Sequence, residues 1–169
     1  MTTSTRAKVP PAATRYEDDV YTWLQEQIAL LRAGKIADID ADNIAEELSD
    51  VASAIRDQFE SAIAVLTQHL LKWEHQPERR SRSWMASVAE QRRRITKLLR
   101  RHPGLKGTLA EAIEEGYADG RDRASGETNL PVKVFPAVCP YTFDDLMTRP
   151  IDFDSKPAPA RKSRSRAAR

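Results

Sequence analysis

The feature that most constrains this chain is an unbroken run of apolar residues, spaced by three or four positions, between Ile44 and Trp73. This spacing returns to one side of an α-helix, whereas a β-strand would show strict alternation. Asp40 and Asp42 precede the run and suit a helix N-terminus, and Pro77 stops it. The pattern therefore predicts a single helix of about 34 residues, about 50 Å long, as the spine of the fold.

A shorter helix is predicted before this spine. Thr14 and Glu17 have the spacing of a capping box, in which each side chain satisfies a backbone donor at a helix start. Apolar residues then recur at helical spacing up to Gly34, which can adopt the left-handed conformation that ends a helix.

Two more helices are predicted after the spine. The first is capped by Ser81 or Ser83 and ends before Pro103. The next carries Gly116 and Gly120 on one face, where the absence of side chains would let another backbone pass close by.

Helical periodicity is lost after Ser125. Residues 127–154 hold several prolines separated by apolar side chains, which favours an extended strap lying across the helices. A short helical turn is expected from Phe143 to Met147. The sequence thus predicts an all-α fold: a bundle of about four helices with a long central helix and a Pro-rich extended C-terminal strap.

The two ends of the chain differ from this domain in composition. Residues 1–13 are aperiodic, and residues 155–169 contain only Pro, Ala, Ser, Lys and Arg. Such segments cannot bury enough apolar surface to fold. We therefore expect a disordered N-terminal arm over 1–13, a single helical domain over 14–154 and a disordered basic tail over 155–169.

Cysteine usage and hydropathy bear on localisation. Cys139 is the one cysteine, which excludes an intramolecular disulfide and a cysteine zinc cluster. The chain has no run of about 18 apolar residues and no secretory leader after Met1. A cytoplasmic protein without a membrane segment is expected.

Charge alternates in blocks along the chain. Residues 15–60 hold 4 Lys and Arg against 12 Asp and Glu, and residues 61–106 hold 11 against 3. Residues 107–154 hold 4 against 10, and the tail holds 6 against none. Acidic and basic helices packed side by side would explain the blocks, and so would a basic surface that binds phosphate.

The candidate binding site is the cationic connector before the third helix and the first turns of that helix. Unpaired backbone N–H groups at a helix start favour anions, and the planar arginine side chain suits phosphate or carboxylate. In the alternative interpretation Ser81 or Ser83 only caps the helix, Trp73 and Trp84 are core, and the arginines pair with Glu46, Glu47 or Asp50. The candidate anion or nucleic-acid binding residues are Lys72, Arg79, Arg80, Arg82, Trp84, Arg92, Arg93 and Arg94.

No catalytic residue, metal site or cofactor is predicted. His69 and His75 are six residues apart and so lie on different sides of a helix, and no His-Glu-x-x-His spacing occurs. Cys139 has no histidine nearby in sequence. Whether the chain is an enzyme stays open at this point, with a non-enzyme favoured.

Several short motifs occur in a fixed order: Tyr16-Glu-Asp-Asp19, His69-Leu-Leu-Lys-Trp73, Gln76-Pro77, Arg80-Ser81, Ser83-Trp84, Glu90-Gln-Arg92, Leu130-Pro131 and Cys139-Pro-Tyr-Thr142. Over about residues 15–147 the chain resembles domain-of-unknown-function family 29, a set of small α-helical bacterial proteins. It departs from that pattern at Ala52 and Asn129, where glycine is expected, although Asn tolerates positive φ. The resemblance implies architecture and no chemistry.

Three functions remain open. The first is a non-enzymatic binding or regulatory module whose basic surface and tail engage nucleic acid or another polyanion. The second is a protein-interaction adaptor or homo-oligomer in which acidic and basic faces meet. The third is a hydrolase built on Glu46, Glu47, His69 and His75.

Overall fold

A computed structural model describes residues 14–153 of the chain, and the regular secondary structure of these residues is helical, with no β-strand among them. The expected arm over 1–13 and the expected basic tail over 155–169 lie outside the described residues. The all-α fold with a long central helix is confirmed. The chain divides after Ala52 into two compact units. The single domain expected over 14–154 stays a prediction.

The first unit contains α1 (Val20–Arg32), a 3₁₀ turn (Ile36–Asp38) and the beginning of α2 (Ala41–His75). The capping box expected at Thr14 is wrong, because α1 begins later, with Asp19 at its N-cap. The Asp19 carboxylate accepts hydrogen bonds from the backbone and the hydroxyl of Thr22, and these bonds lower the pKa of Asp19. Thr14 instead donates to the Glu26 carboxylate.

A few long side chains hold the first unit together. Trp23 is buried, and the ring of Tyr16 meets it edge-on at 5.0 Å between centroids. The hydroxyl of Tyr16 donates to the Glu47 carboxylate over 2.8 Å, and this bond raises the pKa of Tyr16 to about 12. The buried amide of Gln27 accepts from the backbone N–H of Asp40 over 2.9 Å. These contacts fasten α1 to the start of α2.

The long helix predicted from the apolar run is confirmed as α2, which has 35 residues. Asp40 accepts a hydrogen bond from the backbone N–H of Asn43, as a capping residue does. The helix ends at His75, and Pro77 opens a 3₁₀ turn directly after it.

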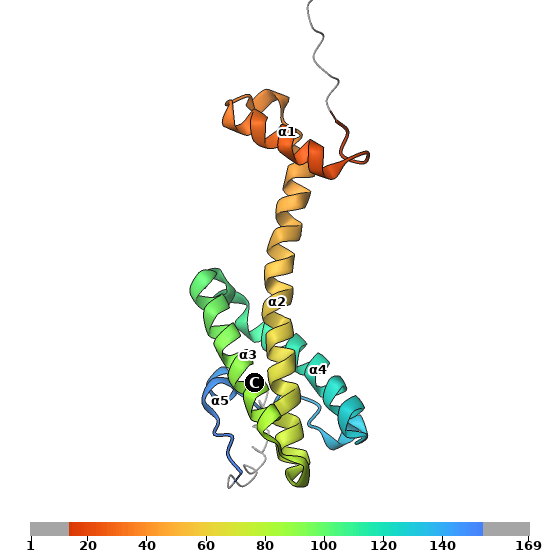
Figure 1. Ribbon diagram of the computed structural model, residues 1–169, viewed down its shortest axis with the longest axis vertical. Coiled ribbons are helices and arrows are strands. Elements are labelled where there is room, and N and C mark those ends of the chain that lie inside the picture. Colours follow the sequence, from red (N-terminus) through yellow and green to blue (C-terminus); the bar gives the residue numbers. More distant parts are fainter. Residues whose placement is uncertain (1–13, 154–169) are drawn as a thin grey trace, which may run out of the picture. The chain divides into compact units, whose positions relative to one another are not determined.

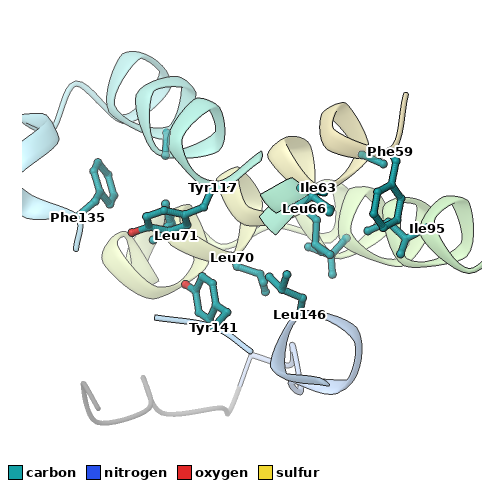
Figure 2. Close-up of a cluster of buried hydrophobic side chains, with 14 of the residues drawn as sticks. Phe59, Ile63, Leu66, Leu70, Leu71, Ile95, Tyr117, Phe135, Tyr141 and Leu146 are labelled. Carbon is teal, nitrogen blue, oxygen red and sulfur yellow. The ribbon is translucent and has the colours of Figure 1, made fainter. Parts of the chain in front are cut away.

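In the second unit, the later part of α2 packs with α3 (Arg82–Arg101), α4 (Leu109–Thr128) and α5 (Phe143–Thr148) (Figure 1). Ser81 is the N-cap of α3 and accepts from the backbone N–H of Trp84. A 3₁₀ turn, Pro103–Thr108, precedes α4. Figure 2 shows the buried cluster to which these elements contribute; it includes Phe59, Ile63, Leu66, Leu70, Leu71, Ile95, Tyr117, Phe135, Tyr141 and Leu146.

The backbones of α2 and α4 pass very close to one another. A Cβ added to Gly116 would lie 2.8 Å from the Ile63 side chain, and one added to Gly120 would lie 2.5 Å from the Ala64 carbonyl oxygen. The Thr67 hydroxyl oxygen lies 3.3 Å from the Gly116 carbonyl oxygen across this contact. The close approach predicted at the two glycines is therefore confirmed.

The segment after α4 packs into the second unit. The helix ends at Asn129, whose φ of 56° lies in the left-handed region, as its replacement of a glycine suggests. Phe135, Tyr141 and Leu146 are buried. The Tyr117 hydroxyl donates to the Pro136 carbonyl over 2.7 Å. The short helical turn expected at Phe143 is α5, which begins with a capping box between Thr142 and Asp145.

Among the helices of residues 14–153, none has both the length and the apolar character that a membrane span requires.

Candidate functional site

The predicted site residues divide into two groups. Four of them are engaged in contacts within the second unit: Lys72, Arg80, Trp84 and Arg92. The other four are exposed to solvent: Arg79, Arg82, Arg93 and Arg94. The sequence could not separate these groups, because arginines of both kinds follow one another on the same helix.

Lys72 is a buried cation, with 6% of its surface exposed. Its ammonium group pairs with the carboxylate of Glu127 on α4 and lies 4.4 Å from the centre of the Trp84 ring on α3. The hydrogen bond from Lys72 lowers the pKa of Glu127. Lys72 therefore links three helices, and its charge is already partnered.

Arg80 lies against the end of α2. Its Nε donates to the backbone carbonyl of Trp73 over 2.9 Å, and its guanidinium group lies 5.0 Å from the centre of the Trp73 ring. Carbonyls in the last turn of a helix have no intrahelical donor, and a cation suits the negative end of the helix dipole. Trp73 is itself buried, so Arg80 covers the end of the central helix.

Arg92 binds the end of α5. Its Nε donates to the carbonyl of Leu146 over 2.8 Å, and a terminal nitrogen donates to the carbonyl of Arg149 over 2.7 Å. Burial lowers the pKa of Arg92. This fork satisfies two carbonyls at a helix C-terminus and joins α3 to the C-terminal segment.

The exposed cations continue beyond those that were predicted. Lys97, Arg100 and Arg101 in the later turns of α3 are also exposed. In the described part of the chain, no acidic side chain forms an ion pair with them or with the exposed cations of the first turns. We call the following set the basic face of α3: Arg82, Arg93, Arg94, Lys97, Arg100 and Arg101.

Helical spacing is the signal that could have added the unpredicted cations Lys97, Arg100 and Arg101 to the candidate set. Arg93 follows Arg82 by 11 positions and Arg100 follows Arg93 by 7, and both intervals return to nearly the same side of a helix with 3.6 residues per turn. Glu90 is the one acidic residue within α3. The basic face is therefore a row of cations rather than a mixed surface.

A second charged group lies around Glu74 and is more buried than the basic face of α3. The Glu74 carboxylate pairs with the Arg149 guanidinium over 2.9 Å, and both side chains are mostly buried. The ring of Tyr141 lies 5.4 Å below that guanidinium. Burial raises the pKa of Glu74, although Arg149 and Tyr141 lower it, and burial also raises the pKa of Tyr141. This pair anchors the C-terminal segment to α2.

The four residues of the hydrolase hypothesis have separate surroundings. No hydrogen bond joins any two of Glu46, Glu47, His69 and His75 among the described residues. Nδ1 of His69 is buried without a hydrogen-bond partner, and His75 packs edge-on against Phe135 at 4.9 Å. Burial lowers the pKa of both histidines.

An open cavity of about 270 Å³ lies between α2 and α4. It is lined by Asp57, Glu60, Ser61, Glu115, Gly116 and Asp119. Burial raises the pKa of Glu60, whose carboxylate lies 3.8 Å from Arg56. Within residues 14–153, no group of three His, Cys, Asp or Glu side chains is arranged to hold a metal ion. The acidic cavity repels anions.

The comparison with protein families identifies the chain. Residues 15–151 match the family model described as "Domain of unknown function DUF29", so the chain belongs to this family. No curated protein and no solved structure matches it. Membership in this family assigns no activity to the chain. The exposed surfaces of the described residues are therefore the basis for a proposed function.

Proposed function

We propose that this member of the DUF29 family binds a polyanion, with nucleic acid as the first candidate, through the basic face of α3. The observation that supports this proposal is the exposure of six cations on a single helix without acidic partners among residues 14–153. Like charges placed together in this way repel one another, and a polyanion removes that repulsion.

The mechanism is electrostatic. Each Lys or Arg that contacts a phosphate releases a condensed counterion, which makes binding favourable at low salt and weaker at high salt. Phosphate contacts position the ligand without reading its sequence. The proposal rests on the exposed residues of the candidate set and leaves Lys72, Arg80 and Arg92 in their internal contacts.

Substitution on the basic face tests the proposal. The full chain and the double variant Arg93→Gln with Arg100→Gln are titrated with labelled duplex and single-stranded oligonucleotides by fluorescence anisotropy. Lys133→Gln is the matched control, because Lys133 is an exposed cation outside α3. We expect the double variant to weaken binding of every oligonucleotide by roughly tenfold at low salt and the control to leave it unchanged, because the loss of phosphate contacts weakens binding about uniformly across sequences.

Two results would overturn the proposal. In the first, the double variant binds as the wild type does. In the second, a chain that ends at Asp154 binds no oligonucleotide, which would assign the binding to residues 155–169. Light scattering of the same samples tests the adaptor alternative: salt-sensitive self-association lost with Arg93→Gln and Arg100→Gln would assign the basic face to another copy of this chain.

A further inference from the structure

The C-terminal segment is fixed to the second unit as far as the last described residue. Arg92 donates to two backbone carbonyls at the end of α5, and the Arg149 guanidinium pairs with the Glu74 carboxylate over 2.9 Å. The ring of Phe153 then lies 5.6 Å from the ring of Trp73, centre to centre, a distance at which aromatic rings attract each other. The end of the described chain is therefore held against the last turn of α2.

This anchored end lies beside the beginning of α3 (Figure 1). The Arg80 guanidinium lies 5.0 Å from the centre of the Trp73 ring, so Arg80 and Phe153 contact the same side chain. Arg80 directly precedes the N-cap of α3, and Arg82, the first residue of the basic face, is exposed. The described chain therefore ends at the N-terminal end of the basic face of α3.

The residues that follow carry charge of one sign. Residues 155–169 hold six Lys and Arg and no Asp or Glu, and we call them the basic tail. The basic face of α3 has six cations as well. Two cationic groups repel each other, so the basic tail has no electrostatic reason to bind the basic face. A polyanion that contacts both groups removes the repulsion between them.

The lengths of the two cationic elements are compatible with a single ligand. α3 has 20 residues, from Arg82 to Arg101, and is about 30 Å long at 1.5 Å per residue. A fully extended chain of 15 residues, the length of the basic tail, spans at most about 50 Å. A duplex of about 20 base pairs is roughly 68 Å long at 3.4 Å per pair, which is enough to contact both elements.

We propose that the basic tail and the basic face of α3 bind one polyanion jointly, and that the anchored C-terminal segment holds the tail where it acts together with the face. This inference rests on the proposed function, because it adds a second contact to the same ligand. Once the basic face has bound, the tail meets the polyanion at an effective concentration that is set by the connecting chain. The joint affinity is then the product of the two separate affinities and that concentration, whereas two independent sites would give only their sum.

Neutral variants of the full chain distinguish a product from a sum. The tail-neutral variant has Gln in place of all six Lys and Arg of the basic tail. The second variant carries Arg93→Gln and Arg100→Gln. Both are titrated with a labelled duplex of about 24 base pairs by fluorescence anisotropy at low salt, and joint binding predicts that each loses at least about tenfold in affinity. With independent sites, at least one of the two variants would lose no more than about twofold.

The pattern of losses separates this inference from the proposed function. A tail-neutral variant that binds as the wild type does, while Arg93→Gln with Arg100→Gln weakens binding, would overturn the joint site and leave the proposed function in place. If Arg93→Gln with Arg100→Gln binds as the wild type does, the proposed function fails and the joint site fails with it. A tail-neutral variant that binds more tightly than the wild type would also overturn the joint site, because the tail would then hinder binding.

A linker tests the part played by the anchored segment. About 40 Gly and Ser residues inserted between Asp154 and Ser155 keep every cation but lower the effective concentration, which falls roughly as the −3/2 power of length. We expect the affinity to fall by about fivefold to tenfold. An insertion of about 4 such residues is the matched control and should change the affinity by less than about twofold. Equal affinities with the two linkers would overturn the proposal.

The basic tail added as a separate molecule completes the test. A synthetic peptide of residues 155–169 is mixed with the tail-neutral variant at the same concentration as the protein. It should not restore the wild-type affinity, because the peptide is no longer held beside the basic face. Full restoration by the free peptide would show that covalent attachment is unnecessary and would overturn the proposal.

Discussion

Gly120 on α4 lies against Thr67 on α2 so closely that a Cβ at Gly120 would stand 2.0 Å from the Thr67 hydroxyl oxygen. The Thr67 hydroxyl oxygen lies 3.0 Å from the carbonyl oxygens of both Ile63 and Ala64 in its own helix, and a hydrogen bond to either of them holds the hydroxyl in place. The contact between α2 and α4 therefore depends on the absence of a side chain at Gly120, as it does at Gly116.

Gly120→Ala should destabilise the protein. The added methyl group would also lie 2.5 Å from the Ala64 carbonyl oxygen, so two helix backbones would have to separate. We expect a loss of about 1–3 kcal/mol in the free energy of unfolding, measured by urea denaturation. Gly126→Ala on the same helix is the control, because a Cβ there meets no atom within 4 Å, and it should be neutral or slightly stabilising. Equal effects of the two changes would contradict this packing.

Replacing Asn129 with glycine should preserve the stability of the protein, whereas replacing it with a β-branched residue should reduce that stability. At a φ of 56°, a β-branched residue lowers the free energy of unfolding by about 1–2 kcal/mol, whereas glycine adopts this angle freely. Asn129→Val should therefore lower the thermal unfolding midpoint, and Asn129→Gly should leave it unchanged or raise it. A Val variant as stable as the Gly variant would show that α4 does not end in this conformation.

Removing the carboxylate of Glu127 should destabilise the protein more than removing the ammonium group of Lys72. Glu127→Gln leaves a buried ammonium group with a weaker partner, whereas Lys72→Met leaves a carboxylate that is 54% exposed and can be hydrated. We expect a cost of about 1–2 kcal/mol for Glu127→Gln, reduced by that solvent exposure, and a smaller one for Lys72→Met. Chemical denaturation of both variants checks the order, and the reverse order would be inconsistent with a buried Lys72.

Glu74 should make stability depend on pH in a defined direction. Burial raises its pKa in the folded protein above the usual 4.5, so the folded state binds the proton more tightly than the unfolded state does. The resulting stabilisation is full below the unfolded pKa and is lost as pH rises through the folded pKa. The free energy of unfolding of the wild type, minus that of Glu74→Gln, should therefore fall as the pH rises above the usual pKa of 4.5. A difference that rises with pH would contradict this.

Local signals in the sequence predicted much of the fold. Pro77 ends α2, Ser81 caps α3, and Gly116 marks a close helix contact, because each effect depends on the residue's own backbone chemistry. The start of α1 was missed because two capping signals compete, and Asp19 forms the cap while Thr14 bonds to Glu26. Which of the two residues caps α1 therefore depends on a tertiary contact, the hydrogen bond from Thr14 to Glu26.

The site was less predictable for a related reason. A cationic run shows that arginines are present but does not show where each side chain points, so Arg92, bound to two carbonyls, and exposed Arg93 look alike in sequence. Likewise, the spacing of Leu48 and Val51 predicts an apolar helix face without showing whether anything covers it.

The salt dependence of oligonucleotide binding by a chain ending at Asp154 tests the central claim most directly. The logarithm of the affinity, plotted against the logarithm of salt concentration, should have a steep negative slope, and Arg93→Gln with Arg100→Gln should reduce its magnitude by about 2, close to one for each lost phosphate contact. An affinity that does not change with salt, or a slope that is the same in the double variant, would contradict binding through the basic face of α3.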